Sequence, residues 1–194
     1  MTSVKIQGRP GNHPPRPSHS SNQLGSARKS RVIVALGGNL PSGVGSPEET
    51  VAAALDALSE SDINILAVSP FYRTPAWPDP SDPPYVNAVS LMETALDPVS
   101  LLARLHDIER SFGRIRTSRN APRTLDLDLI DHGGRVETGP PTLPHPRMTE
   151  RAFVLIPLSD VAPEWIHPVT GEGITELIAH LPAGAAAGVV ALGP

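Results

Sequence analysis

The sequence predicts an α+β fold, in which helices pack on a β-sheet. Strand-like and helix-like apolar patterns follow one another in the order strand, helix, strand, strand, helix, strand. The chain has 194 residues, enough for one domain of ordinary size with additional segments. Apolar residues make up 39% of the chain, which suffices for one hydrophobic core. We therefore expect a single folded body built around one sheet.

Composition excludes several classes of site and partner. The chain has no cysteine, which rules out disulfides, thiolate zinc sites and cysteine nucleophiles. No apolar run approaches the roughly 20 residues of a membrane helix, and no signal-peptide apolar region is present. We expect a cytoplasmic protein that does not associate with membranes and that functions as a monomer.

Charge is distributed unevenly along the chain. Residues 1–30 carry a charge of +5, which leaves −9 for residues 31–194 when the total is −4. An acidic body argues against a nucleic-acid-binding surface. Lys29 is the last lysine, so no Walker-type lysine exists beyond it. Any phosphate bound by the folded body must contact arginines, metal ions or backbone amides.

Composition also divides the chain into three parts. Residues 1–30 are rich in Pro, Ser, Gly and Asn and have few apolar side chains, which predicts a disordered basic tail. A transit peptide is the functional alternative, although the prolines argue against it. Residues 31–182 form the predicted domain. The Ala/Gly-rich segment 183–194 is expected to be frayed.

The first two elements have clear local signals. Residues 31–36 are a continuous β-branched run, typical of a buried strand, and end at Gly37-Gly38. The two glycines suit either a tight turn or a backbone that approaches a ligand closely. Ser46 and Glu49 form a capping-box pattern around Pro47, which predicts a helix that ends near residue 60.

Two further strands flank a long proline-rich loop. Residues 63–72 are predicted to form one strand and residues 85–93 another. The intervening loop is typical of a binding loop or lid that presents Trp77. Tyr85 and Asn87 share one face of the later strand, where a ring and an amide suit a flat heterocycle. The alternative is that Tyr85 packs under the loop and Asn87 faces solvent.

A second helix leads into a run of arginines and then an acidic strand. Asp97-Pro98 begins the helix, and its apolar side chains repeat at helical spacing to Phe112, before Gly113. Residues 114–123 then contain four arginines. Beyond them, residues 125–129 alternate leucine with Asp126 and Asp128, so both carboxylates lie on one strand face, with Cα atoms roughly 6.6 Å apart.

The acidic pair and the arginines together predict a metal-bound polyphosphate. Carboxylates hold hard cations such as Mg²⁺, and guanidinium groups match phosphate oxygens. Taken alone, an Asp-x-Asp pair is more often plain solvated surface. The pairing of like charges on one face nevertheless favours a cation between them.

The C-terminal part predicts one presented histidine and two helices. Residues 142–147 are extended because of their prolines, and His145 is held between two of them. A single histidine is more often structural than functional, but this setting favours a presented side chain. A tight turn at Gly133-Gly134 is expected to lead into a short return strand. Short helices are predicted from Met148 and over residues 174–181.

Six blocks of the sequence, in order and at the right spacing, resemble the 6-hydroxymethyl-7,8-dihydropterin pyrophosphokinases of folate biosynthesis. The blocks are residues 35–40 (ALGGNL), 71–75 (FYRTP), 85–89 (YVNAV), 108–114 (IERSFGR), 122–130 (PRTLDLDLI) and 143–148 (LPHPRM). The resemblance covers about residues 31–170, and the block at 122–130 is its most specific part. It implies a ferredoxin-like α+β sandwich, with which the predicted order of elements agrees.

The resemblance also implies an activity and a set of site residues. The activity is transfer of diphosphate from ATP to the pterin hydroxymethyl group, with AMP released. Two Mg²⁺ ions are implied at Asp126 and Asp128, and catalytic arginines at Arg114 and Arg123. The implied pterin residues are Thr74, Pro75, Trp77, Tyr85, Asn87 and Phe153. The implied ATP residues are Glu109, Arg116, Arg119, Leu129, Thr142, His145 and Arg151.

Two positions depart from the family pattern. Many members have Trp-Gly before the Pro-Arg-Thr block, whereas this chain has a loop one residue shorter with Asn120-Ala121. The aromatic residue that often follows the histidine is replaced by Pro146. Two other hypotheses are an RNA-binding ferredoxin-like module and a relative that binds pterin without catalysis. The acidic body and the missing strand aromatics argue against the first. The complete set of charged site residues argues against the second.

Overall fold

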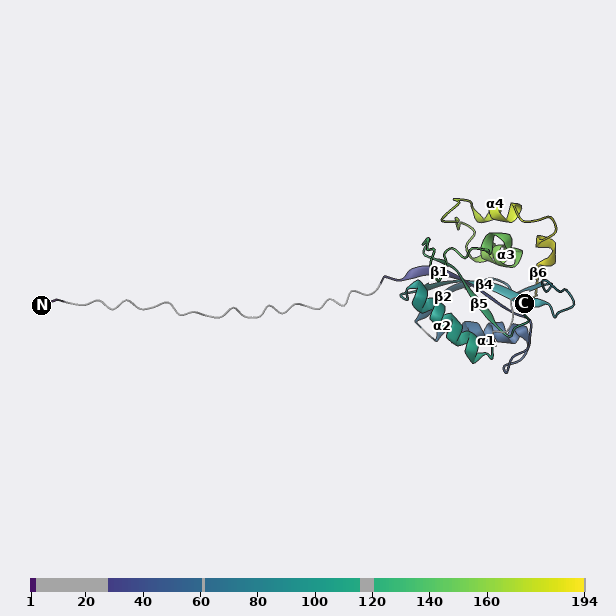
Figure 1. Cartoon of the computed structure of the whole chain (residues 1–194), viewed down its shortest axis with the longest axis horizontal. Helices are drawn as coiled ribbons and strands as arrows, with labels where there is room; N and C mark the ends of the chain where they lie inside the picture. Colours follow the sequence, from purple (N-terminus) through teal and green to yellow (C-terminus); the bar gives the residue numbers. More distant parts are fainter. Residues whose placement is uncertain (3–27, 61, 116–120, 194) are drawn as a thin grey trace.

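The computed structural model describes residues 1–2, 28–60, 62–115 and 121–193. In these ranges an antiparallel sheet lies between two helical layers (Figure 1). The predicted ferredoxin-like α+β sandwich is therefore confirmed. The predicted disordered tail falls almost wholly on residues 3–27, and Arg116 and Arg119 fall in 116–120. Both segments lie outside the described residues.

The sheet is organised around two long neighbouring strands. β1 (Ser30–Gly38) pairs with β4 (Tyr85–Thr94) on one side and with β5 (Asp126–His132) on the other. β2 (Ile63–Val68) and β3 (Tyr72–Thr74) both pair with β4, and β6 (Val190–Ala191) pairs with β3. The end of β1, the start of β4 and the start of β5 therefore lie at the same end of the sheet.

The single strand predicted over residues 63–72 is wrong, because the segment forms two strands. Ser69 and Pro70 separate β2 from β3. The Ser69 backbone N–H donates to Val89 O at 3.0 Å, and the Ser69 Oγ accepts from Val89 N at 3.0 Å. Pro70 has no N–H to donate to a strand ladder. The chain bends there and rejoins β4 farther along.

Within the ranges given above, four α-helices cover the two faces of the sheet. α1 (Pro47–Ser59) and α2 (Pro98–Ser111) pack on one face, and α3 (Ala152–Val161) and α4 (Ile174–Ala179) on the other (Figure 1). The predicted capping box is confirmed: Ser46 N donates to Glu49 Oε2 at 2.8 Å, and Glu49 N donates to Ser46 Oγ at 3.3 Å. Short 3-10 turns occupy Met148–Glu150 (η1) and Ala186–Gly188 (η2).

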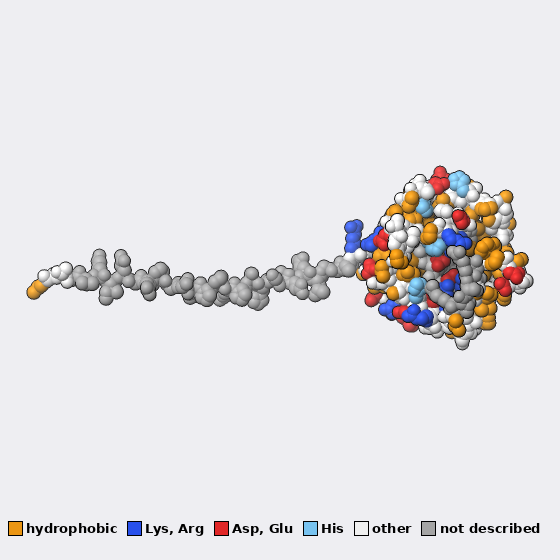
Figure 2. Space-filling model, in the orientation of Figure 1, with side chains coloured by type: hydrophobic (Ala, Val, Ile, Leu, Met, Phe, Trp, Pro, Cys, Tyr) orange, Lys and Arg blue, Asp and Glu red, His pale blue; other side chains and the backbone are white. Residues whose placement is uncertain are grey.

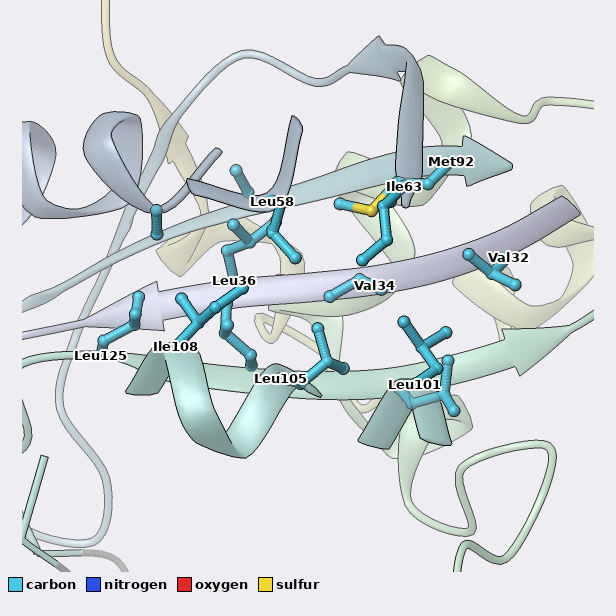
Figure 3. Close-up of a cluster of buried hydrophobic side chains, with 14 of the residues drawn as sticks. Val32, Val34, Leu36, Leu58, Ile63, Met92, Leu101, Leu105, Ile108 and Leu125 are labelled. Atoms are coloured by element: carbon cyan, nitrogen blue, oxygen red, sulfur yellow. The ribbon is translucent and has the colours of Figure 1, made fainter. Parts of the chain in front are cut away.

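The alternation of side chains along the strands builds a separate core on each face. Val32, Val34 and Leu36 of β1 point toward α1 and α2, where Figure 3 shows them beside Leu58 of α1 and apolar side chains of α2. Ile33 and Ala35 point toward α3 and α4. Leu125, Leu127 and Leu129 all belong to the first core. The aspartates between these leucines must therefore face the α3 side.

The C-terminal segment differs from its predicted frayed state. Val190 and Ala191 pair with Arg73 and Tyr72 of β3, and Leu192 N donates to Phe71 O at 2.7 Å. Its Ala/Gly composition gives no local signal for this pairing, which depends on an edge offered by a distant strand. The return strand predicted after residue 135 does not form within the described residues, where Glu137 and Leu143 make one isolated bridge.

Replacing Tyr72 by phenylalanine is expected to destabilise the fold by about 1.5–3 kcal/mol, the usual range for a hydrogen bond to a charged group. The Tyr72 hydroxyl donates to Asp160 Oδ2 at 2.7 Å and so joins β3 to α3. Burial, reinforced by Asp160, raises the Tyr72 pKa from 10.0 to about 12. The contribution of the protonated Tyr72 hydroxyl to the free energy of unfolding is complete below pH 10 and is lost as the pH rises toward 12. Urea unfolding of both proteins at pH 8 and above pH 10 measures it, and equal stability at pH 8 would contradict the prediction.

No helix in the described part of the chain is both long and apolar enough to cross a membrane.

Candidate active site

A cavity of about 480 Å³ opens on the α3 face of the sheet, at the end where β1, β4 and β5 meet. β1 contributes Ala35 and Gly37 to its walls, and the start of α3 contributes Arg151 and Phe153. Acidic and basic side chains lie interspersed on the face of the folded part drawn in Figure 2. The predicted site residues that line the cavity are Thr74, Pro75, Trp77, Tyr85, Asn87, Arg123, Asp126, Asp128, Arg151 and Phe153.

The carboxylates of β5 stand on one wall of this cavity. The side chains of Asp126 and Asp128 are 24% and 32% exposed, whereas Leu127 between them is buried. The predicted alternation along this strand is therefore confirmed. Within the described residues, no group of three or more His, Cys, Asp or Glu is placed to hold a metal ion. Any cation held here would take its remaining ligands from substrate and water.

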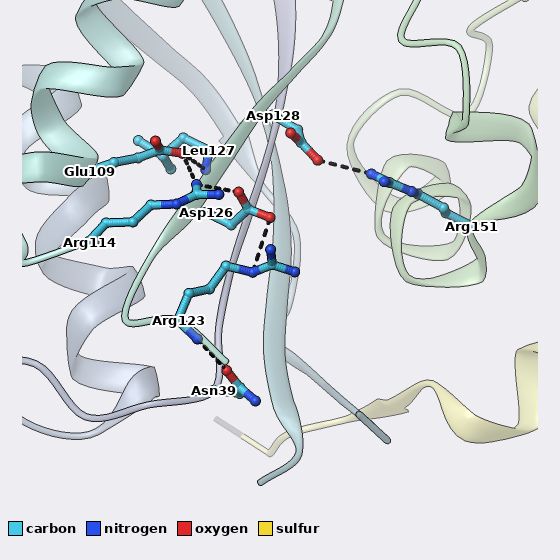
Figure 4. A network of polar contacts seen from close by, with 8 residues as sticks. All are labelled: Asn39, Glu109, Arg114, Arg123, Asp126, Leu127, Asp128 and Arg151. Carbon is cyan, nitrogen blue, oxygen red and sulfur yellow. Dashed lines mark hydrogen bonds and ion pairs between the residues drawn. The ribbon is translucent and has the colours of Figure 1, made fainter. Parts of the chain in front are cut away.

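Three arginines neutralise the two carboxylates. Arg114 forms an ion pair with Asp126, and Arg123 Nε lies 3.4 Å from Asp126 Oδ2. Arg151 Nη1 donates to Asp128 Oδ2 at 2.9 Å. Figure 4 shows Arg114 and Arg123 meeting Asp126 from two sides, while Arg151 points at Asp128 from the α3 layer. Two connecting segments, one between α2 and β5 and one just before α3, thus bring guanidinium groups to one strand face.

Glu109 holds one of these arginines from behind the strand. Its side chain is 2% exposed, forms an ion pair with Arg114, and accepts the Leu127 N–H at 2.8 Å. A buried carboxylate needs such partners to offset its desolvation. Glu109 and Arg114 line a smaller neighbouring hollow rather than the main cavity. The structure therefore places Glu109 as a support of Arg114.

Two aromatic rings and an amide also line the cavity. Asn87 is 5% exposed and donates from Nδ2 to Thr74 Oγ1 at 2.8 Å. The Arg123 guanidinium lies 5.3 Å from the centroid of the Tyr85 ring, and that of Arg151 lies 5.5 Å from the Phe153 ring. Each ring is thus linked by a cation–π contact to an arginine of the carboxylate cluster.

Asn39 fixes the backbone on which Arg123 stands, a role that the sequence did not reveal. Asn39 Oδ1 accepts the Arg123 N–H at 2.8 Å, and its Nδ2 donates to Pro83 O at 3.0 Å. The Asn39 and Leu40 N–H groups both donate to Arg123 O, at 2.9 and 3.1 Å. Asn39 is 2% exposed. One buried amide therefore joins the proline-rich loop to the arginine segment.

The Gly37-Gly38 pair is explained by close packing. A Cβ added to Gly38 would lie 2.3 Å from Thr124 O, and one added to Gly37 would lie 2.7 Å from Asn87 Oδ1. The contact at Gly38 is with backbone and excludes any larger residue, whereas a Cβ at Gly37 would displace the Asn87 amide. The pair therefore lets the start of β5 and the Asn87 amide sit against β1, and Gly37 itself lines the cavity.

Of the predicted ATP residues that the structure describes, four do not line the cavity. Leu129 is 4% exposed in the α1–α2 core, so its side chain faces away from the site. Thr142 is exposed, Glu109 is buried as described, and His145 is half-buried beside the arginines. Burial lowers the His145 pKa, with Asp128 opposing and Arg151 and Arg147 adding to the shift. Cavity-lining residues that the sequence did not mark are Arg147, Glu150, Ala152, Gly184, Ala185, Gly188 and Val189.

The stability of the protein is expected to fall as the pH drops below 6.5. The pKa values of His145 and His167 are both lowered, mainly by burial, so protonation favours the unfolded chain. The two neutral histidines contribute to the free energy of unfolding above pH 6.5. This contribution is lost as the pH falls through their lower pKa values in the folded protein. Urea unfolding between about pH 7 and pH 5 should therefore show a smaller loss in His145→Gln/His167→Gln than in the parent. Equal losses would contradict this assignment.

The comparison with the double variant is needed because Asp131 changes the stability of the protein with pH in the direction opposite to the histidines. Burial raises the pKa of this carboxyl group, so its contribution to stability is lost as the pH rises. Both proteins contain Asp131. The difference between their pH profiles therefore reports the two histidines together with the interaction of His167 with Asp131.

Comparison with known proteins identifies a family. The profile of 7,8-dihydro-6-hydroxymethylpterin-pyrophosphokinase matches residues 33–163. A 2-amino-4-hydroxy-6-hydroxymethyldihydropteridine pyrophosphokinase of Synechocystis sp. is 40% identical over 149 residues, which are 76% of this chain and 74% of that protein. The enzyme of the same name from Pseudomonas aeruginosa is 42% identical over 154 residues, 78% of this chain and 92% of that protein.

Solved structures support the fold. The HPPK-DHPS protein of Plasmodium falciparum, in its crystal structure with pteroate, superposes with a TM-score of 0.60 at 14% identity. The match covers 78% of this chain but only 42% of the longer Plasmodium chain. At this level of identity the likeness concerns the fold alone.

Proposed function

The chain belongs to the 7,8-dihydro-6-hydroxymethylpterin-pyrophosphokinase family, and from this premise we propose that the cavity beside β5 is its active site. The reaction is pyrophosphoryl transfer from ATP to the hydroxymethyl group of 6-hydroxymethyl-7,8-dihydropterin in folate biosynthesis. The observation that carries the proposal is a cavity lined by two carboxylates, two aromatic rings and a buried amide, in which three arginines pair with the carboxylates.

The carboxylate pair suits Mg²⁺ bound together with ATP. Mg²⁺ typically takes one or two protein carboxylates and completes its octahedron with phosphate oxygens and water. Asp126 and Asp128 supply two partly exposed carboxylates and, among the described residues, no third protein ligand joins them. In the proposed complex they would hold two ions. Bound Mg²⁺ supplies charge neutralisation for the phosphate oxygens and positions them for transfer.

The arginines are proposed to move from carboxylates to phosphates when nucleotide binds. Arg114, Arg123 and Arg151 now balance the charge of Asp126 and Asp128. A metal cation at the carboxylates would take over that balance and release the guanidinium forks for phosphate oxygens. Glu109 would keep Arg114 within reach of the site, since it contacts the same guanidinium. His145 is proposed to lie at the nucleotide end.

The pterin is proposed to lie between the Tyr85 and Phe153 rings. Both rings line the cavity, and Asn87 lies beside them with its amide already joined to Thr74. The amide offers both a donor and an acceptor, which matches the alternating polar edge of a pterin. Trp77 is 65% exposed at the rim and can cover the bound ring. This arrangement leaves the hydroxymethyl group pointing toward Asp126.

Transfer then depends on positioning and charge. The pterin hydroxyl oxygen forms a bond to the β-phosphorus of ATP and loses its proton to water, while the bond from that phosphorus to the α,β-bridging oxygen breaks and AMP leaves. Such transfers need no covalent nucleophile from the protein. Arg123 contacts both the Tyr85 ring and Asp126, so it lies where pterin and triphosphate would meet. We propose that it stabilises the charge that develops on the phosphate oxygens.

Incubation of the chain with ATP, Mg²⁺ and 6-hydroxymethyl-7,8-dihydropterin tests the proposed site. We expect AMP to form in step with the pterin diphosphate and to stop when EDTA removes the metal. Pterin binding without AMP formation would instead indicate a relative that binds without catalysis. The cytoplasmic location and monomeric state stay predictions.

A further inference from the structure

We propose that the C-terminal residues 182–192, called the strap below, form a wall of the active site that sets the width of the pterin end. The strap lies beyond residues 33–163, the part that matches the family profile. Gly184, Ala185, Gly188 and Val189 of the strap line the cavity. The inference deepens the proposed function, since it rests on the pterin occupying this end of the cavity.

The strap is anchored on both faces of the sheet. Upstream, α4 places Ile174 and Leu177 in the core beneath α3, and Leu181 packs against the same core. Downstream, β6 pairs with β3 and Leu192 packs against the α1–α2 core. Figure 1 shows the end of the chain passing beside α3 on its way to β6. A segment held at both ends has a defined position between them.

Between its anchors the strap contacts both sides of the proposed pterin site. Its 3-10 turn η2 packs against α3, the helix that carries Phe153. On the other side, Gly188 meets Pro75, the residue after Thr74 of β3. A Cβ built on Gly188 would lie 3.3 Å from Pro75 Cδ and 3.6 Å from Pro75 Cγ. The strap therefore sets the spacing between the Phe153 wall and the Thr74–Pro75 wall.

The chemistry of the strap suits a wall rather than a recognition group. Its cavity-lining residues are glycine, alanine and valine, which carry no polar side chain. They add apolar surface beside the rings and leave polar recognition to Asn87 and the backbone near Thr74. Small residues keep this wall thin, so it leaves room for the flat heterocycle held between the two rings. A larger side chain in the strap would narrow the proposed pterin site from the side of Pro75.

Gly188 offers a clean test because its backbone tolerates other residues. Its φ lies outside the left-handed region, unlike that of Gly184 at +83°. Substitution at position 188 therefore changes the space beside Pro75 without forcing a strained backbone. Gly193 has nothing within 4 Å of an added Cβ and also lies outside the left-handed region, so it is a matched control near the same end of the chain.

The experiment compares Gly188→Val with Gly193→Val in the full chain by pterin binding and by kinetics. Overpacking at Gly188 should raise the Kd and KM for 6-hydroxymethyl-7,8-dihydropterin about tenfold, equivalent to about 1.4 kcal/mol. The KM for ATP should stay within about twofold of the parent, because the strap makes none of the arginine–carboxylate contacts. Gly193→Val should behave like the parent. Equal pterin affinity in the two variants would overturn the proposal.

A double-mutant cycle separates wall spacing from a general loss of structure. Pro75→Ala removes Cγ and Cδ, the atoms that an added Cβ at position 188 would meet. Gly188→Ala should weaken pterin binding about threefold beside Pro75 and leave it unchanged beside Ala at position 75. The same weakening in both backgrounds would overturn the proposal, even if Gly188→Val folds poorly. A parent chain that binds no pterin would overturn the proposed site and the strap role together.

Discussion

Alanine at Asp126 or Asp128 is expected to lower the rate of AMP formation on the order of 10³-fold or more, while the fold survives. The loss of one preorganised charge group at a phosphoryl-type transition state is typically of this size. Each carboxylate faces the cavity rather than the core, so no buried packing is removed. Arg114 keeps Glu109 as a partner when Asp126 is absent. Steady-state AMP formation at saturating ATP and Mg²⁺ measures the effect.

Asp56→Ala is the matched control for this experiment. Asp56 is an exposed aspartate of α1, on the opposite side of the sheet from the cavity. Its removal should leave AMP formation unchanged. Thermal unfolding should show all three variants folded like the parent. Full activity in Asp126→Ala or Asp128→Ala would contradict the metal assignment.

Arg123→Ala is expected to reduce kcat about a hundredfold with a smaller change in the KM values. Arg123 contacts Asp126 and stacks over Tyr85, so its guanidinium lies between the proposed phosphate and pterin positions. Arg123→Lys should recover only part of the rate, because an ammonium group cannot form the planar fork. The hydrogen bonds of Asn39 to the backbone of residue 123, called the Asn39 clamp below, should hold that backbone in the same place in each variant.

Arg135→Ala serves as the control for Arg123. Its side chain is 50% exposed and pairs only weakly with Glu137 at 3.5 Å, away from the cavity. Its replacement should leave kcat unchanged. A kcat for Arg123→Ala equal to that of Arg135→Ala would show that Arg123 takes no part in the chemical step.

Local patterns predicted the features of the fold that depend on residues close in sequence. The capping box at Ser46 and Glu49 formed because both partners lie within one helical turn. The alternation of leucine and aspartate placed Asp126 and Asp128 on one face because side chains alternate along any strand. Tyr85 and Asn87 line the same cavity for the same reason.

Features that depend on distant contacts were beyond prediction from local patterns. The break at Ser69 depends on hydrogen bonds to Val89 of another strand. The segment that contains the strap was predicted to be frayed, because the parts of the fold that anchor it, β3 and the two cores, lie far from it in sequence. The Asn39 clamp likewise depends on Pro83 and Arg123, which each lie more than 40 residues from Asn39 in the sequence. Leu129 lies in the core, as the alternation of side chains along the strand predicts. The family resemblance implied instead that this residue contacts ATP.

The most direct test of the central claim is the number of divalent ions bound at the β5 carboxylates. Mn²⁺ can replace Mg²⁺ in such a titration, with a non-hydrolysable ATP analogue and the pterin present. The account predicts two ions per parent chain and loss of this binding in Asp126→Ala/Asp128→Ala, with Asp56→Ala unchanged. Two ions bound by the double aspartate variant with parental affinity would contradict it.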